Sequence, residues 1–205
     1  MRLGAGLLVL AAAGCAPAGD PAGNAQVHAL GDGRGDPALR GEAALAAALN
    51  EDLLASSSAT LVLEHWCAER YIADPAVIVA AVERGADKPA SAEIRSRLSA
   101  SRGTPIAYRR VRLMCGNTVL SIADNWYVPG RLTEAMRAAL AGDAPFGKVI
   151  LPLAPHRENL AAELRWAGQQ PGELLRHRAR VVAKNGQPLA YVVETYQSGI
   201  AAGED

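Results

Sequence analysis

The chain has 205 residues, half of them hydrophobic, and its 21 basic and 21 acidic side chains cancel. This composition supports one hydrophobic core, and the neutral charge argues against a nucleic-acid-binding protein, whose surface would be basic. The four histidines are not grouped with cysteines at metal-ligand spacing. The sequence also has neither a nucleophile elbow nor a Gly-x-x-x-x-Gly-Lys loop. It therefore predicts no metal site and no cofactor.

The first fourteen residues have the pattern of an export signal. Arg2 is positively charged, residues 3–13 form an apolar run too short to span a bilayer, and Ala12-Ala13-Gly14 precede Cys15. Small residues before a cysteine resemble a lipobox, which implies cleavage before Cys15 and a lipid on its sulfur. Ala16 in the next position implies the outer membrane. We expect a periplasm-facing protein held to the membrane by the lipid alone; the alternative is a secreted protein cut nearby.

Residues 15–37 are rich in glycine, proline and small side chains, which predicts a flexible tether. Residues 38–205 then form one domain. Its first expected element is a helix over 38–54, with leucines near one face at Leu45, Leu49, Leu53 and Leu54. Three serines at 56–58 end this helix and offer N-caps for a second helix over 59–71.

The middle of the chain predicts a strand over 76–82 and a polar loop with a helical turn over 83–104. Residues 106–113 then alternate, with Tyr108, Arg110 and Arg112 on the side opposite Val111. Turn chemistry at 115–118 and a returning strand over 119–128 complete a hairpin.

The last third predicts a short helix over 133–141, a strand over 148–153 and a second hairpin. This hairpin pairs 174–184 with 189–197 through Asn185-Gly186, a type I′ turn signal. Residues 154–173 have no clear period. The elements together predict a single α+β domain in which helices pack on a mostly antiparallel sheet.

Two cysteines remain if Cys15 carries a lipid, and these are Cys67 and Cys115. In an oxidising compartment they predict one disulfide. The alternative is a pair of buried free thiols, which are common in apolar cores.

Two charged residues stand on otherwise apolar strands. Glu194 lies within an apolar run over 190–196, and Arg110 lies in the middle of the first hairpin. Burying either charge is costly unless it is paired or used. One interpretation is a structural ion pair; the other is a pocket in which Arg110 binds a carboxylate and Glu194 holds or moves a proton.

Several motifs resemble chorismate pyruvate-lyase, whose fold also occurs in the ligand-sensing UTRA domains of transcription regulators. The resemblance covers roughly residues 53–199. It rests on Tyr108-Arg109-Arg110-Val111-Arg112-Leu113-Met114-Cys115, Ala123, Val128-Pro129, Ala144-Pro145-Phe146-Gly147, His177-Arg178-Ala179-Arg180, and Gly186-Gln187-Pro188-Leu189 leading to Glu194.

The resemblance implies an antiparallel sheet with an enclosed cavity, and cleavage of chorismate into 4-hydroxybenzoate and pyruvate without a cofactor. By position, Arg110 would hold the ring carboxylate and Glu194 would lie near the ring oxygen. Phe146 would form the cavity wall, and Ala59 would begin the helix that closes the cavity.

One position departs from the family. Where its members carry a Gly-Arg pair, this chain has Asp124 and Asn125, so the cation for the second anionic group of the substrate is replaced. A lost charge-assisted hydrogen bond weakens binding of a dianion by about 1.5–3 kcal/mol.

We therefore expect a lipid-anchored envelope protein whose cavity binds a small, aromatic carboxylate without catalysis. One alternative is an active chorismate pyruvate-lyase that uses Glu194 and Arg110. The other is a structural or partner-binding envelope lipoprotein without a small ligand.

Overall fold

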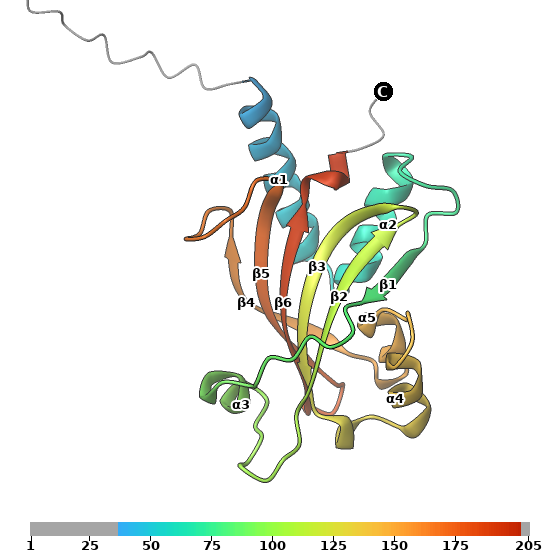
Figure 1. Cartoon of the computed structure of the whole chain (residues 1–205), viewed down its shortest axis with the longest axis vertical. Coiled ribbons are helices and arrows are strands. Elements are labelled where there is room, and N and C mark those ends of the chain that lie inside the picture. Colours follow the sequence, from blue (N-terminus) through green and yellow to red (C-terminus); the bar gives the residue numbers. More distant parts are fainter. Residues whose placement is uncertain (1–36, 202–205) are drawn as a thin grey trace, which may run out of the picture. The chain divides into compact units, whose positions relative to one another are not determined.

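Six antiparallel strands form one sheet in the order β1-β2-β3-β6-β5-β4 (Figure 1). The computed structural model describes residues 37–201, so the expected signal sequence, Cys15 and the tether up to residue 36 lie outside the described residues. The strands are β1 Ile78–Val82, β2 Ala107–Cys115, β3 Thr118–Tyr127, β4 His156–Glu163, β5 Glu173–Val182 and β6 Pro188–Gln197. With the helices packed on this sheet, the structure confirms the predicted α+β class.

Helices cover the face of the sheet that carries Val111, Ala123 and Val192. They are α1 Pro37–Ala55, α2 Ala59–Glu69, α4 Glu134–Leu140 and α5 Phe146–Val149. Leu49 and Leu53 of α1 are fully buried, whereas Leu54, expected on the same face, is 47% exposed. Ser58 caps α2 as predicted, because its hydroxyl accepts the Leu61 N–H. Among the described residues, no helix combines the length and apolar character needed to cross a membrane.

The other face of the sheet has a thinner cover. The short helix α3 (Ala92–Arg97) and its flanking loop pack a small apolar cluster around Trp126 and Tyr191. Elsewhere this face carries ion pairs in place of a helix, as the alternation of apolar and charged residues along β2 and β5 dictates.

The expected strand over 148–153 was wrong. Its first residues belong to α5, which Pro145 precedes as N-cap, and Leu151–Leu153 form a 3-10 turn around Pro152. Proline fixes its own φ and has no N–H to give to a strand partner, so this apolar run folds into turns. The run still reaches the core, because Ile150 is only 1% exposed.

The second hairpin forms as predicted, but through a different turn. Gly186 alone adopts positive φ, at 82°, and its N–H donates to the carbonyl of Ala183 at 2.8 Å. The Ala183 N–H donates to Gln187 O at 2.9 Å, which leaves a three-residue loop with a bulge. A type I′ turn needs positive φ at Asn185 as well, so the observed turn is a type I turn followed by a left-handed glycine.

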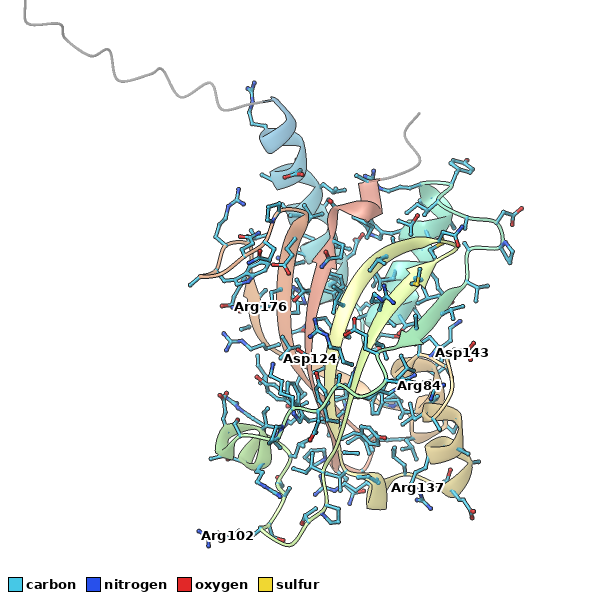
Figure 2. All side chains as sticks on the ribbon, viewed as in Figure 1. Arg84, Arg102, Asp124, Arg137, Asp143 and Arg176 are labelled. Carbon is cyan, nitrogen blue, oxygen red and sulfur yellow. A yellow bond between two sulfur atoms is a disulfide. The ribbon has the colours of Figure 1, made fainter. Side chains whose placement is uncertain are left out.

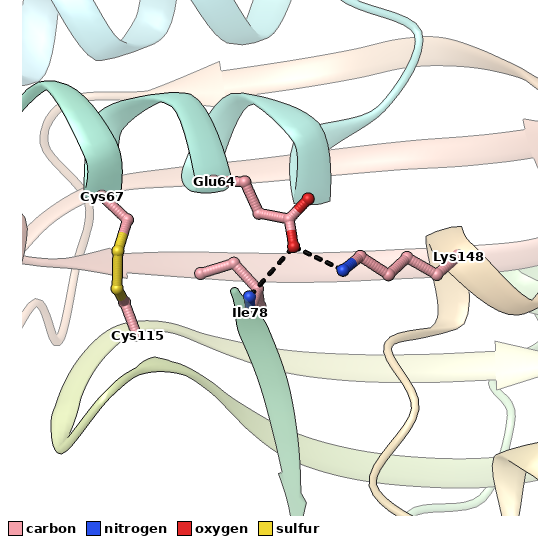
Figure 3. Close-up of a disulfide and its surroundings, with 5 residues drawn as sticks. All are labelled: Glu64, Cys67, Ile78, Cys115 and Lys148. Atoms are coloured by element: carbon pink, nitrogen blue, oxygen red, sulfur yellow. Dashed lines mark hydrogen bonds and ion pairs between the residues drawn. A yellow bond between two sulfur atoms is a disulfide. The ribbon is translucent and has the colours of Figure 1, made fainter. Parts of the chain in front are cut away.

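Two interactions hold α2 against the sheet, and a third joins it to α5 (Figure 3). Cys67 and Cys115 form the predicted disulfide between α2 and the end of β2, with Cα atoms 6.3 Å apart. Glu64 Oε1 accepts the backbone N–H of Ile78 on β1 at 3.0 Å and also pairs with Lys148 of α5. The middle and the second half of α2 are therefore held against the sheet.

Candidate functional site

A cavity lies between the sheet and the starts of α2 and α5. Its open volume is about 90 Å³, measured as the space available to the centre of a water molecule. The sheet contributes side chains from β2, β3, β5 and β6, and β4 contributes Arg157. Lining residues come from these strands, from 57–61 around the start of α2, and from 146–155 around α5: Ser57, Ser58, Ala59, Thr60, Leu61, Val111, Leu113, Ala123, Asn125, Phe146, Gly147, Ile150, Leu151, Pro155, Arg157, Val181, Val192 and Glu194.

A buried ion pair forms the charged part of this cavity. Arg157 Nη2 lies 2.6 Å from Glu194 Oε2, and the two side chains are 4% and 9% exposed. Arg157 is on β4 and Glu194 is on β6, and β5 lies between these two strands. The registers place Arg157 beside Val181 and Glu194 beside His177 of β5. Between those two positions, on the same face of β5, stands the small side chain of Ala179. This leaves room for the long arginine to reach across to Glu194.

Neighbouring groups hold the pair in place. Tyr196 donates its hydroxyl hydrogen to Glu194 Oε2 at 3.1 Å, and Arg157 Nε donates to Asn159 Oδ1 at 2.8 Å. His177 is fully buried next to them, with its Nε2 2.8 Å from Asn50 Oδ1 of α1. His177 also packs edge-on against Tyr196, with ring centroids 5.6 Å apart, so contacts run from the ion pair through Tyr196 and His177 to α1.

Burial and charge shift the pKa values of these groups. Burial disfavours the charged guanidinium, but attraction by Glu194 leaves the pKa of Arg157 above its ordinary value. Burial, and then Glu194, raises the pKa of Tyr196. Burial, followed by repulsion from Arg157, lowers the pKa of His177 to about 4. At neutral pH Arg157 is therefore a guanidinium, Tyr196 a neutral phenol and His177 a neutral imidazole.

Uncharged polar groups lie elsewhere on the cavity wall. The Asn125 amide donates from Nδ2 to the carbonyls of Arg109 and Ala123, at 3.3 and 3.4 Å. Its Oδ1 is thereby directed away from the backbone. At the rim, an added Cβ at Gly147 would lie 2.9 Å from Thr60 Oγ1, so glycine permits the close approach of α5 to α2.

The structure brings four of the five expected ligand-binding residues to this cavity. Ala59, Asn125, Phe146 and Glu194 all line it. Arg110 does not, because β2 turns Val111 toward the cavity and Arg110 toward the opposite face. There Arg110 donates from Nε to Glu83 and from Nη1 to Asp124 (labelled in Figure 2), both at 2.9 Å. The expectation that Arg110 and Glu194 line one pocket is therefore wrong, because only Glu194 lines this cavity.

Sequence reasoning missed Arg157. It lies within 154–173, where no period was visible, and a register shift between Asn159 and Ala161 interrupts the alternation of β4. One signal could have indicated such a residue: a buried glutamate on a central strand requires a cation nearby. Within residues 37–201, no three His, Cys, Asp or Glu side chains are grouped as metal ligands.

No protein-family model matches the chain. A curated relative, uncharacterized protein y4mC from Sinorhizobium fredii (strain NBRC 101917 / NGR234), is 39% identical over 188 residues. The match covers 81% of this chain and 79% of that protein.

Similar solved structures include regulator effector domains. The effector domain of PhnF from Mycobacterium smegmatis has a TM-score of 0.46 and 10% identity over 58% of this chain and 80% of that chain. A ligand-binding domain described as that of a GntR-family transcriptional regulator from Bordetella bronchiseptica has a TM-score of 0.43 and 18% identity, and the match covers 59% of this chain and 83% of that chain. The possible transcriptional regulator YydK from Bacillus subtilis has a TM-score of 0.41 and 14% identity, and the match covers 58% of each chain. This chain therefore spans less than two thirds of YydK. All TM-scores are below 0.5, so no ligand is transferred from them.

Proposed function

This chain belongs to the same family as protein y4mC of Sinorhizobium fredii, and we propose that it is an exported binding domain that holds a small carboxylate in the cavity beside Arg157. The single observation that carries this proposal is a buried arginine lining an open cavity. Arginine is the side chain best suited to a carboxylate, because its planar guanidinium donates several hydrogen bonds in fixed directions.

The rim of the cavity supports the same ligand chemistry. Residues 59–61 form the first turn of α2, which is 11 residues long, and they line the cavity. The first N–H groups of a helix have no partner within the helix, and the helix dipole favours an anion there. Ser58 already accepts the Leu61 N–H, but among the described residues no hydrogen bond takes up the N–H groups of Ala59 and Thr60. A carboxylate between Arg157 and α2 would gain from both.

Binding without turnover is the form that we propose. Glu194 Oε2 is already engaged by Arg157 and Tyr196, and Arg110, to which the chorismate-lyase resemblance assigns a ring carboxylate, is engaged on the opposite face. The alternative of an active lyase rests on Glu194, which lines the cavity. Pyruvate released from chorismate by the wild type, and not by Glu194→Gln, would establish the lyase and overturn the binding-only proposal.

The anchoring part of the proposal rests on residues 1–15 of the sequence. Cells fed a labelled fatty acid should incorporate the label into the wild-type chain and not into Cys15→Ser. Equal labelling of the two chains, or none in the wild type, would contradict a lipid on Cys15.

Titration calorimetry tests the binding function. We expect the full chain, purified in detergent, to bind at least one of benzoate, 4-hydroxybenzoate and 3-methylbutanoate. Ala123→Phe fills the cavity and should weaken binding at least tenfold, whereas Ala162→Phe changes an exposed position on β4 and should leave it unchanged. Absence of saturable binding would sink the proposal and favour the structural or partner-binding alternative.

A further inference from the structure

We propose that the ligand of this cavity is a zwitterion, a small aliphatic amino acid whose ammonium group faces Glu194 and Asn125 and whose carboxylate faces Arg157. This inference rests on the proposed carboxylate-binding function and makes it more specific. It follows from the charge of the cavity, from the atoms left without partners, and from the size and polarity of the walls.

The charge of the cavity favours a ligand with no net charge. Among the described residues, Arg157 and Glu194 are its only charged lining side chains, and they cancel. A ligand with a carboxylate alone would place a second anion beside Glu194 and leave one negative charge uncompensated in a buried site, which is costly. A zwitterion adds one charge of each sign and keeps the site neutral.

Two acceptor oxygens are available for an ammonium group. Arg157 and Tyr196 both engage Glu194 Oε2, and within residues 37–201 no hydrogen bond reaches Glu194 Oε1. Asn125 likewise uses its Nδ2 on backbone carbonyls, while its Oδ1 accepts nothing from the described residues. The strand registers Ala123↔Glu194 and Asn125↔Val192 make the two side chains diagonal neighbours on adjacent strands. Their oxygens can therefore converge on one group.

A donor remains available for the carboxylate. Arg157 uses Nε on Asn159 and Nη2 on Glu194. Its third nitrogen, Nη1, has no partner in the part of the chain that the structure describes. Because a guanidinium offers five N–H donors, Arg157 can keep Glu194 in place and still bind a ligand carboxylate.

The walls and the volume select the side chain of the amino acid. The volume open to the centre of a water molecule is about 90 Å³, so the cavity is small and favours a short ligand side chain. Its apolar wall includes Val111, Leu113 and Val192. At its opening, Leu61 and Leu151 are each 49% exposed. These features fit a short aliphatic side chain directed toward the opening.

The test compares each amino acid with the same molecule lacking its amine. The full chain is titrated with L-alanine, L-valine, L-leucine and L-isoleucine, and with propanoate, 3-methylbutanoate, 4-methylpentanoate and 3-methylpentanoate. We expect at least one amino acid to bind about tenfold to a hundredfold more tightly than its deaminated partner, as one charge-assisted hydrogen bond requires. This wild-type comparison decides the matter without any variant.

Two variants assign the preference to the cavity. Glu194→Gln and Asn125→Leu should each reduce the ratio of the two affinities at least tenfold. Glu163→Gln removes a carboxylate from the opposite face and should leave the ratio unchanged. If the carboxylates bind and the amino acids bind no better, the zwitterion inference is overturned and the proposed function stands. If neither group binds, both are overturned.

Discussion

The two faces of the sheet carry the same kinds of charged residue in very different surroundings. On the helix-covered face, Arg157 and Glu194 form one ion pair beside the cavity, with side chains 4% and 9% exposed. On the opposite face, Arg110 pairs with Glu83 at 34% and 36% exposure, and Arg176 (labelled in Figure 2) pairs with Glu163. Nitrogen–oxygen distances are similar, at 2.6 and 2.9 Å.

This difference shows that burial, rather than the nitrogen–oxygen distance, determines how much an ion pair contributes to stability and to ligand binding. The Arg110–Glu83 and Arg176–Glu163 pairs are partly exposed, and the solvent around them screens their attraction, so they contribute little to stability. The buried pair has lost its hydration, and each charge depends on the other. Because the buried pair lines an open cavity, a ligand can form hydrogen bonds with its remaining polar atoms. The charges on the opposite face are already paired with one another and hydrated by water.

Removing one member of the buried pair should have the largest effect. Arg157→Met leaves Glu194 as an uncompensated charge, and we expect the free energy of unfolding to fall by about 3–5 kcal/mol. Urea unfolding followed by circular dichroism measures it. The double replacement of Arg157 by Met and Glu194 by Leu should recover most of the loss. A loss below about 1 kcal/mol would mean that cavity water screens this pair as solvent does on the opposite face.

The disulfide should come next, because it holds the helix-covered face together. It joins residues 48 apart, so reduction should lower the free energy of unfolding by about 2–4 kcal/mol. Urea unfolding with and without a reductant measures the change. The matched control is the double variant Cys67→Ala, Cys115→Ala, on which the reductant should have no effect; an equal response of the two proteins would contradict this assignment.

The pH dependence of stability should report His177. Its pKa is about 4 in the folded protein and about 6.5 when unfolded, so between these values the unfolded chain binds more protons. The stabilisation is complete above pH 6.5 and is lost as the pH falls toward 4, by up to about 1.4 kcal/mol per pH unit. Urea midpoints from pH 7.5 to 4.5 should fall more steeply for the wild type than for His177→Gln. Parallel curves would rule out His177 as the source.

The smallest effects are expected on the opposite face. Glu163→Gln and Glu83→Gln each remove a partner of a partly exposed ion pair, and each should lower the free energy of unfolding by only about 0–1 kcal/mol. Arg110→Gln also removes the guanidinium from Asp124, whose side chain is 11% exposed, so it should cost more than these two. None of these replacements should change the affinity for a cavity ligand, since none of the three residues lines the cavity. Loss of binding in Arg110→Gln with an unchanged unfolding curve would restore Arg110 to the site.

Sequence patterns predicted the fold well where a period was strong. The alternation in 106–113 correctly placed Arg110 opposite Val111, and the turn residues located both hairpins. The apolar run over 148–153 led to the wrong prediction of a strand, because Pro152 has no N–H to donate to a neighbouring strand and lies in a 3-10 turn. β4 stayed unseen because a bulge interrupts its alternation.

The candidate site was predictable only in part. Ala59, Asn125, Phe146 and Glu194 were named from the sequence, and all four line the cavity. Arg157 was not named, and Arg110 was expected in the wrong place. The alternation of a strand states which residues share a face, but it carries no information about which face receives the helices.

The sequence by itself determined the α+β class, the two hairpins and the candidate disulfide pair, because periodicity, turn residues and cysteine number are local properties of the chain. The tertiary structure decided which charges meet. Arg157 and Glu194 are 37 positions apart and on strands that are not neighbours, and their pairing depends on strand order, register and the small residue between them. Burial then makes the free energy of unfolding depend strongly on that pair, and burial is a property of the assembled fold.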